Sequence, residues 1–176
     1  AQMTDFFEKV KSQTDPFKKL AAYIPGFNGY VERQTRRDAD KLVRETVARR
    51  FEELWKRTSN LQSELVSNGM ITYVDDIEKA ALQLRTFIDK ISTAPRGYSG
   101  LFDAIKINET ELESLYQFDL AFFDLAEQIQ RGLDVLEASL NDETALPAAI
   151  RNLVSLARLA VETYNRRSEA LTGSPA

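Results

Sequence analysis

Apolar residues recur three and four positions apart along most of this 176-residue chain, the spacing that places them on one face of an α-helix. No stretch alternates apolar and polar residues as a half-buried β-strand does. The pattern therefore predicts an all-α protein without a β-sheet. The clearest stripe consists of Val43, Val47, Phe51, Leu54, Thr58, Leu61 and Leu65.

Turn-forming residues divide this pattern into segments of helical length. The third long segment is apolar on nearly every side over residues 112–129, as expected for a helix buried by several neighbours. Short amphipathic helices are expected in the N-terminal part, before residue 24. The predicted bundle helices lie at about 29–66, 74–92, 109–140 and 144–171, with a short helix at about 99–106.

Individual residues indicate where several helices begin and end. Pro16 is expected at the first position of a helix that ends near Tyr23. Gly69 is expected to take the left-handed conformation that closes the first long helix. Asp75 and Glu78 form a predicted capping pair for the second.

Short connections favour antiparallel neighbours, so we predict an up-down four-helix bundle. The expected organisation is an amphipathic appendage at 1–28, the bundle at 29–172 and a tail at 173–176. Such a bundle places the start of the first long helix, residues 93–107 and the end of the last helix at one end, called the pole below. Two glycine–aromatic turns, PGFNGY and PRGYSG, should then lie near each other at the pole.

The chain contains neither cysteine nor histidine. Their absence excludes disulfides, thiol nucleophiles, Ser-His-Asp triads and metal sites built on either residue. No apolar run approaches the ~20 residues of a membrane-spanning helix, and no secretory signal is visible. We expect no catalytic residue, metal or cofactor, and a location in the cytoplasm or at the membrane periphery.

Positive charge is concentrated early in the chain, despite a net charge of −4. Residues 30–57 carry nine Lys/Arg against six Asp/Glu, whereas residues 58–176 carry ten against eighteen. Arginine forms planar, bidentate hydrogen bonds with phosphate and carboxylate, so an arginine-ringed, aromatic pole is the main candidate for binding an anion or a partner. The alternative is that neighbouring acids already pair these arginines. The candidate residues are Arg33, Arg36, Arg37, Arg96, Arg166, Arg167, Tyr30 and Tyr98.

A second candidate surface lies in the N-terminal segment, where aromatic residues alternate with lysines. Residues 3–24 could bind anionic lipid as an interfacial helix, or could fold back onto the bundle. The lipid hypothesis makes the protein a peripheral membrane-surface protein. Its candidate residues are Phe6, Phe7, Val10, Phe17, Lys9, Lys11, Lys18 and Lys19.

Two other function classes receive less support. Nucleic-acid binding needs a sustained basic surface, which the acidic excess of residues 58–176 opposes. A carboxylate-based enzyme would use Asp119 or Asp124, within the most hydrophobic segment. These two positions point about 140° apart on a helix and do not share a site. We expect Asp119 to meet an arginine or lysine of a neighbouring helix.

The strings IPGFNGYVERQTRRDADKLVRE and RGYSGLFDAIKINETELESLYQFDLA are similar to segments of a family of small, uncharacterised, all-helical bacterial proteins. That family shares IPG-x-x-GY-x-x-R-x-x-RR-x-ADK and GY-x-G-LFDA-x-K, here at 24–41 and 97–106. The resemblance implies an all-helical fold and no particular activity. More coarsely, the basic long helix resembles phage-shock, membrane-remodelling helical proteins. We therefore expect a non-enzymatic interaction or scaffold module that binds a protein partner or a second copy of itself.

Overall fold

A computed structural model describes residues 16–24, 36–93 and 109–172 of the chain. Within these ranges the prediction of an all-α protein is confirmed, since the described residues contain helices and turns but no strand. Where the ends of the long helices are described, they agree with the predicted ends to within two residues. The expected helices before residue 14 and at 99–106 lie outside the described residues. The helices are α2 (Pro16–Tyr23), α4 (Arg36–Ser67), α5 (Val74–Thr93), α7 (Glu109–Ala138) and α8 (Leu146–Thr172).

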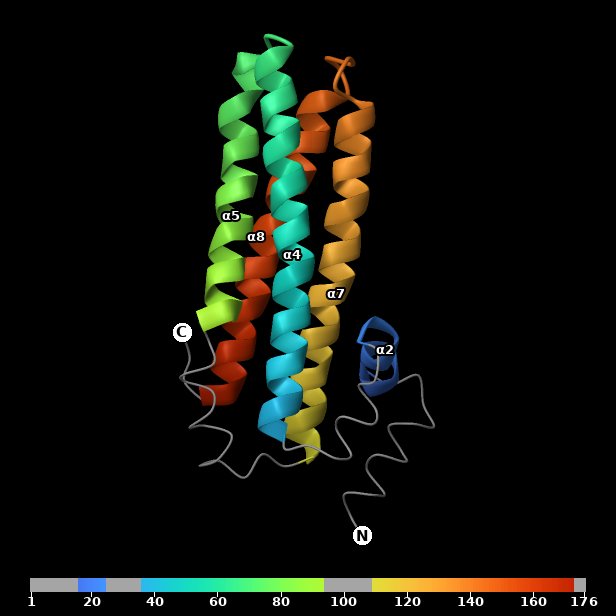
Figure 1. Cartoon of the computed structure of the whole chain (residues 1–176), viewed down its shortest axis with the longest axis vertical. Helices are drawn as coiled ribbons and strands as arrows, with labels where there is room; N and C mark the ends of the chain where they lie inside the picture. The colour runs from blue at the N-terminus through green and yellow to red at the C-terminus, as the bar shows by residue number, and fades with distance from the viewer. Residues whose placement is uncertain (1–15, 25–35, 94–108, 173–176) are drawn as a thin grey trace.

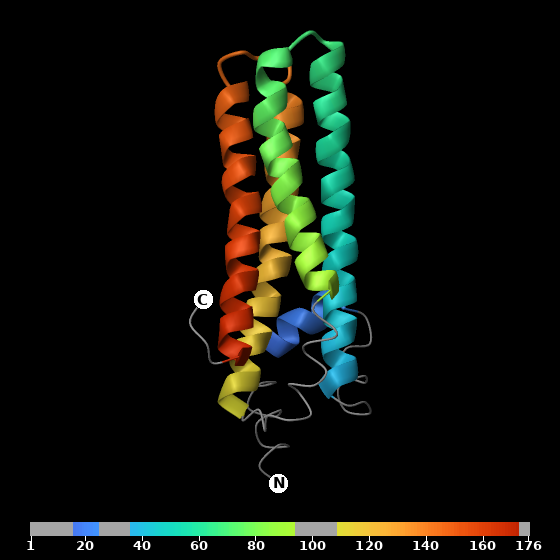
Figure 2. The ribbon, with the colours of Figure 1, turned by 90° about the vertical axis from the view of Figure 1, so that its left-hand side faces the viewer.

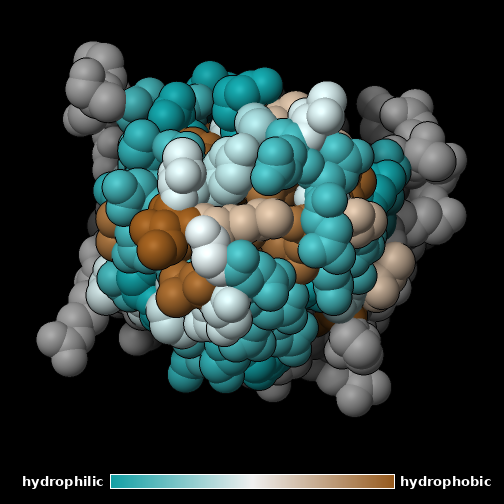
Figure 3. All heavy atoms as spheres, turned by 90° about the horizontal axis from the view of Figure 1, so that it is seen from above, coloured by the Kyte–Doolittle hydropathy of each residue, from teal (hydrophilic) through white to brown (hydrophobic). Residues whose placement is uncertain are grey.

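The four long helices lie along one axis and alternate in direction along the chain (Figure 1). The starts of α4 and α7 and the ends of α5 and α8 therefore meet at the pole, at the bottom of Figure 1. The opposite end, called the tip below, consists of the α4–α5 and α7–α8 turns, which face the viewer in Figure 3. The meeting of helix ends at the pole was predicted from the sequence and is confirmed.

The order of the helices around the axis differs from the expectation that consecutive helices are neighbours. α4 packs against α5 and α7, and α8 packs against the same two helices, so α5 and α7 lie diagonally opposite (Figures 1 and 2). The expectation is right for α4–α5 and α7–α8, which are joined by short turns, and wrong for α5–α7. Fifteen residues separate those two helices, enough to span the roughly 11–14 Å diagonal of a bundle whose neighbouring axes are 8–10 Å apart.

The core follows the predicted stripes. All seven stripe residues of α4 are buried. Aromatic rings connect the diagonal helices through the centre of the bundle. The Phe87 ring of α5 lies 4.2 Å from Phe51 of α4 and 5.2 Å from Phe122 of α7, measured between centroids. Helix α7 packs against α2, α4 and α8, which explains why its sequence is apolar on several sides.

Two of the three predicted helix boundaries are confirmed. Pro16 is the first residue of α2. Gly69 has a φ of 75°, and the N–H of Met70 donates to the Leu65 carbonyl at 2.9 Å, as in a Schellman motif. The Asp75–Glu78 capping pair is wrong, because α5 begins at Val74, after a 3-10 turn at Ile71–Tyr73. Glu78 instead accepts a hydrogen bond from Gln62 Nε2 at 2.7 Å and so links α5 to α4.

Candidate functional site

The pole brings together arginines that are far apart in the sequence. Arg36 and Arg37 are the first two residues of α4, and Arg166 lies near the end of α8, where its side chain is exposed. The side chains of Arg36 and Arg37 are outside the described part, as are residues Arg33, Arg96, Tyr30 and Tyr98 altogether. The described portion of the predicted arginine ring therefore consists of two helix positions on α4 and one exposed side chain on α8.

Arg167 does not belong to an exposed ring, which corrects the expectation for this residue. It is only 1% exposed, and its Nε donates a hydrogen bond to Asp119 Oδ1 at 2.8 Å. The reason is geometric, because successive residues on a helix are turned by about 100°, so Arg166 and Arg167 cannot face the same way. The expectation that Asp119 meets a basic residue of a neighbouring helix is confirmed, since α7 packs on α8.

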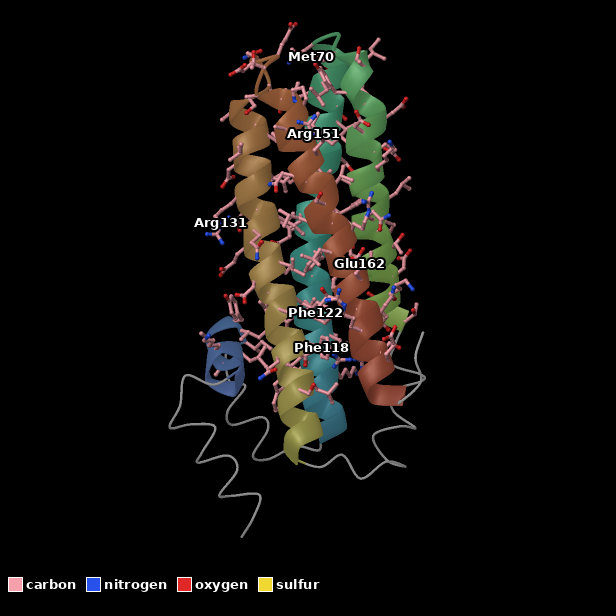
Figure 4. The ribbon with its side chains drawn as sticks, turned by 180° about the vertical axis from the view of Figure 1, so that it is seen from behind. Met70, Phe118, Phe122, Arg131, Arg151 and Glu162 are labelled. Carbon is pink, nitrogen blue, oxygen red and sulfur yellow. The ribbon has the colours of Figure 1, made fainter. Side chains whose placement is uncertain are left out.

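The Asp119–Arg167 pair lies in a polar part of the core in the pole half of the bundle. Arg44 of α4, Tyr116 of α7 and Tyr164 of α8 are buried there as well. Lys90 of α5 approaches this region, with Nζ 5.9 Å from the centre of the Tyr164 ring. Figure 4 shows these helices from behind, with α8 in front and the labelled Phe118 and Phe122 on α7 beside it. All four long helices thus contribute a polar or charged side chain to the pole half.

In the tip half of the described core, the only buried polar side chains are the small hydroxyl-bearing ones of Thr58 and Ser139. Thr58 donates to the Leu54 carbonyl at 2.8 Å within α4, and Ser139, in the turn after α7, donates to the Val135 carbonyl at 2.7 Å. Buried side-chain charge is therefore confined to the pole half of the described residues. Arg44, Tyr116 and Tyr164 were not among the site residues predicted from the sequence.

The described part of the N-terminal segment packs on the bundle. Leu20 and Ile24 are buried, and the Tyr23 ring stacks on Phe123 of α7 with centroids 4.7 Å apart and planes 6° from parallel. Tyr23 Oη donates to Glu127 Oε1 at 2.8 Å. Burial, followed by this hydrogen bond and the charge of Glu127, raises the pKa of Tyr23 to about 12. Residues 19–24 therefore pack on the bundle, which was the predicted alternative to lipid binding.

The predicted lipid-binding residues are only partly covered by the structure. Lys19 is exposed on α2. Phe17 and Lys18 belong to α2, but their side chains are outside the described part. The remaining five candidates lie outside the described residues and comprise Phe6, Phe7, Val10, Lys9 and Lys11.

Two basic residues of the long helix α4, Arg50 and Arg57, form contacts with α7. Arg57 Nη2 bonds Asp134 Oδ1 at 2.6 Å and Glu137 Oε2 at 2.9 Å, and Arg50 donates to Gln130, all on α7. Although burial alone lowers it, hydrogen bonds to the two carboxylates raise the pKa of Arg57 above its ordinary value. These contacts stabilise the packing of α4 against α7.

The described carboxylates do not form a metal-binding cluster, since no group of three or more Asp or Glu is arranged around a common point within the described ranges. Asp124 is exposed, whereas Asp119 is buried, so the two aspartates do not share a site, as predicted. Within the same ranges, none of the helices is long and apolar enough to cross a membrane. Searches of protein-family models, curated proteins and solved structures found no significant match to the chain.

Proposed function

We propose that this protein is a non-enzymatic helical interaction module, acting in the cytoplasm, whose contact surface is the pole. The observation that carries this proposal is the meeting of Arg36, Arg37 and Arg166 at one end of the bundle. Arg166 is exposed, and no ion pair links it to another described side chain. An exposed guanidinium retains all its hydrogen-bond donors for a carboxylate or phosphate on a partner.

The buried polar residues beneath the pole support this proposal. A buried ion pair contributes little net stability compared with an apolar pair of similar volume, but it penalises any arrangement in which its members separate. The Asp119–Arg167 pair therefore favours one register of α8 against α7. A fixed register holds Arg166 in a defined position relative to the start of α4. Such rigidity reduces the entropic cost of binding.

The experiment compares two triple charge reversals in the full chain. The first reverses Arg36, Arg37 and Arg166 to glutamate. The matched control reverses three exposed arginines away from the pole, and these are Arg49, Arg131 and Arg158. Both variants change the net charge equally, so a difference between them reports position rather than total charge.

We expect the pole variant to lose its partners while the control keeps them, measured by cross-linking with mass spectrometry and by sedimentation of the purified protein. Circular dichroism melts establish that both variants remain folded. Equal recovery of partners and equal self-association by the two variants would reject the pole as the contact surface.

A further inference from the structure

The turn that joins α4 to α5 contains an asparagine followed by a glycine. Asn68 and Gly69 are both exposed there, immediately before Met70, which is labelled at the tip in Figure 4. Asparagine is a thermolabile residue, because the backbone nitrogen of the next residue can attack its side-chain carbonyl carbon. Glycine hinders this attack least, since it has no side chain. Among the asparagines of the described ranges, only Asn68 precedes a glycine.

The geometry of the turn requires this glycine. Gly69 has a φ of 75°, a conformation that residues with a side chain rarely adopt. A larger residue would therefore be strained here, even though a Cβ atom would meet no other atom within 4 Å. The glycine that closes α4 is thus also the residue that makes Asn68 reactive.

Backbone hydrogen bonds protect the attacking nitrogen while the turn is closed. The Gly69 N–H donates to the Val66 carbonyl at 3.1 Å, and the N–H of Met70 donates to the Leu65 carbonyl at 2.9 Å. The Asn68 N–H is also engaged, at 2.9 Å from a carbonyl of α4. Attack requires the Gly69 nitrogen to leave its acceptor and lose its proton. The reactive form is therefore an opened turn.

Opening of this turn exposes little buried surface. Residues 66–69 are all exposed in the closed turn, with Val66 at 53%. Segments with few buried contacts open locally at a much lower free energy than the whole fold. Asn60, in contrast, lies inside α4 directly before the buried Leu61, so its backbone opens only with the helix. The structure thus distinguishes Asn68 from Asn60 by position as well as by the next residue.

We propose that Asn68 is a site of spontaneous deamidation whose rate is controlled by opening of the α4–α5 turn. The Gly69 nitrogen bonds to Asn68 Cγ, and the side-chain amide takes up the proton that Gly69 gives up and leaves as ammonia. Water then opens the resulting cyclic imide at either carbonyl. The product at position 68 is aspartate, or isoaspartate with the main chain running through the side-chain carbon. The reaction needs water and no other reactant.

Both products weaken the end of α4. They add a negative charge at the carboxyl end of the helix, where Glu64 is exposed and the last turn contains no basic residue. Negative charge at this end opposes the helix dipole and should raise the equilibrium constant for opening about two- to fivefold. Isoaspartate also lengthens the main chain within the turn that the Met70–Leu65 hydrogen bond closes. A loosened α4–α5 connection therefore accumulates as each protein molecule ages.

The first experiment incubates the full-length protein at mildly alkaline pH and locates the mass gain of amide-to-acid conversion by tandem mass spectrometry. We expect conversion at Asn68 while Asn60 stays intact, and faster conversion at Asn68 in the urea-unfolded chain. Equal conversion at Asn60 and Asn68 in the folded protein, or no conversion at Asn68, would overturn the proposal. Equal rates at Asn68 in the folded and unfolded chains would contradict control by the turn. Asn68 lies opposite the pole, so these outcomes do not depend on the proposed contact surface.

Three variants test the chemistry and its consequence separately. In Gly69→Ala the added methyl group hinders attack, so conversion at Asn68 should slow even though the strained turn opens more readily. An undiminished rate in Gly69→Ala would reject the Gly69 nitrogen as the nucleophile. Asn68→Asp adds the charge directly and should accelerate hydrogen exchange at residues 66–73 about two- to fivefold, whereas the uncharged control Asn68→Gln should not. Equal exchange in these two variants would overturn the predicted loosening of the turn.

Discussion

Arg167 Nε donates a hydrogen bond to Asp119 Oδ1 at 2.8 Å, with the two side chains 1% and 4% exposed. This contact joins α8 to α7 inside the pole half of the bundle. Removing one member of a buried pair leaves a charge in a poorly solvating environment, which costs far more than the intact pair contributes. Any shift of α8 along α7 that separates the pair would carry this cost.

Replacement of Arg167 by methionine should lower the free energy of unfolding by about 3–5 kcal/mol, because Asp119 stays buried without this partner. Urea unfolding followed by circular dichroism measures the loss. Arg166→Met is the control and should change stability by less than about 0.5 kcal/mol, since that side chain is exposed. The double variant Asp119→Leu with Arg167→Met should recover most of the loss. A similar, small effect of both single variants would refute the special cost of the buried pair.

Gly132 allows close packing of α8 on α7. A Cβ atom at this position would lie 3.3 Å from Asn152 Nδ2 and 3.6 Å from Leu156 Cδ1. The Asn152 amide is the end of an exposed side chain and can rotate away, whereas Leu156 is partly buried. The position therefore has room for one methyl group and for little more.

We expect Gly132→Ala to be neutral or to stabilise the protein by up to about 1 kcal/mol, because alanine favours the helix over glycine. Gly132→Leu should destabilise it by roughly 1–3 kcal/mol, as overpacking separates the two helices. Thermal melts of the two variants measure these changes. The prediction fails if alanine is as damaging as leucine.

The sequence predicted the helices well because each long helix carries a continuous apolar stripe. It could not predict the order of helices around the axis, because a stripe identifies the buried face and not the helix that covers it. Only the length of the α5–α7 connection indicated a diagonal placement. The capping pair at Asp75 and Glu78 failed because the chain first forms a 3-10 turn and uses Glu78 between helices.

The site was predicted less completely, for a related reason. Charged residues are almost never fully buried unless paired, so Arg167 was grouped with its exposed neighbour Arg166. The spacing nevertheless indicates that Arg167 is buried. Arg167 continues the three-and-four pattern of buried residues on α8, which includes Leu153, Ala157, Ala160 and Tyr164. A charged residue on a buried stripe predicts a buried partner. Asp119 likewise lies on the buried stripe of α7.

Tyr23 makes the attachment of α2 dependent on pH. Its pKa is about 12 in the folded protein and 10.0 for an unperturbed tyrosine. Because the folded pKa is the higher one, the contribution of Tyr23 is complete below pH 10 and is lost as the pH rises through 12. We expect hydrogen exchange at residues 19–24 to accelerate in that window, more than in α5, and Tyr23→Phe to remove this dependence. A pH dependence that persists in Tyr23→Phe would assign it to another group.

Phe123→Ala tests whether residues 3–24 bind lipid when they detach from the bundle. It removes the ring beneath Tyr23 without altering the N-terminal segment. Loss of a buried phenylalanine costs about 3–5 kcal/mol, so Glu127→Ala, which removes only the hydrogen bond to Tyr23, is the milder companion variant. Because Leu20 of α2 and the following Ile24 are buried, the intact protein should not float with anionic phosphatidylglycerol vesicles at low salt. If the pole is the working surface, neither variant should float more than the intact protein. Flotation that both variants enhance, with phosphatidylglycerol but not with phosphatidylcholine alone, would instead assign the function to the released N-terminal segment.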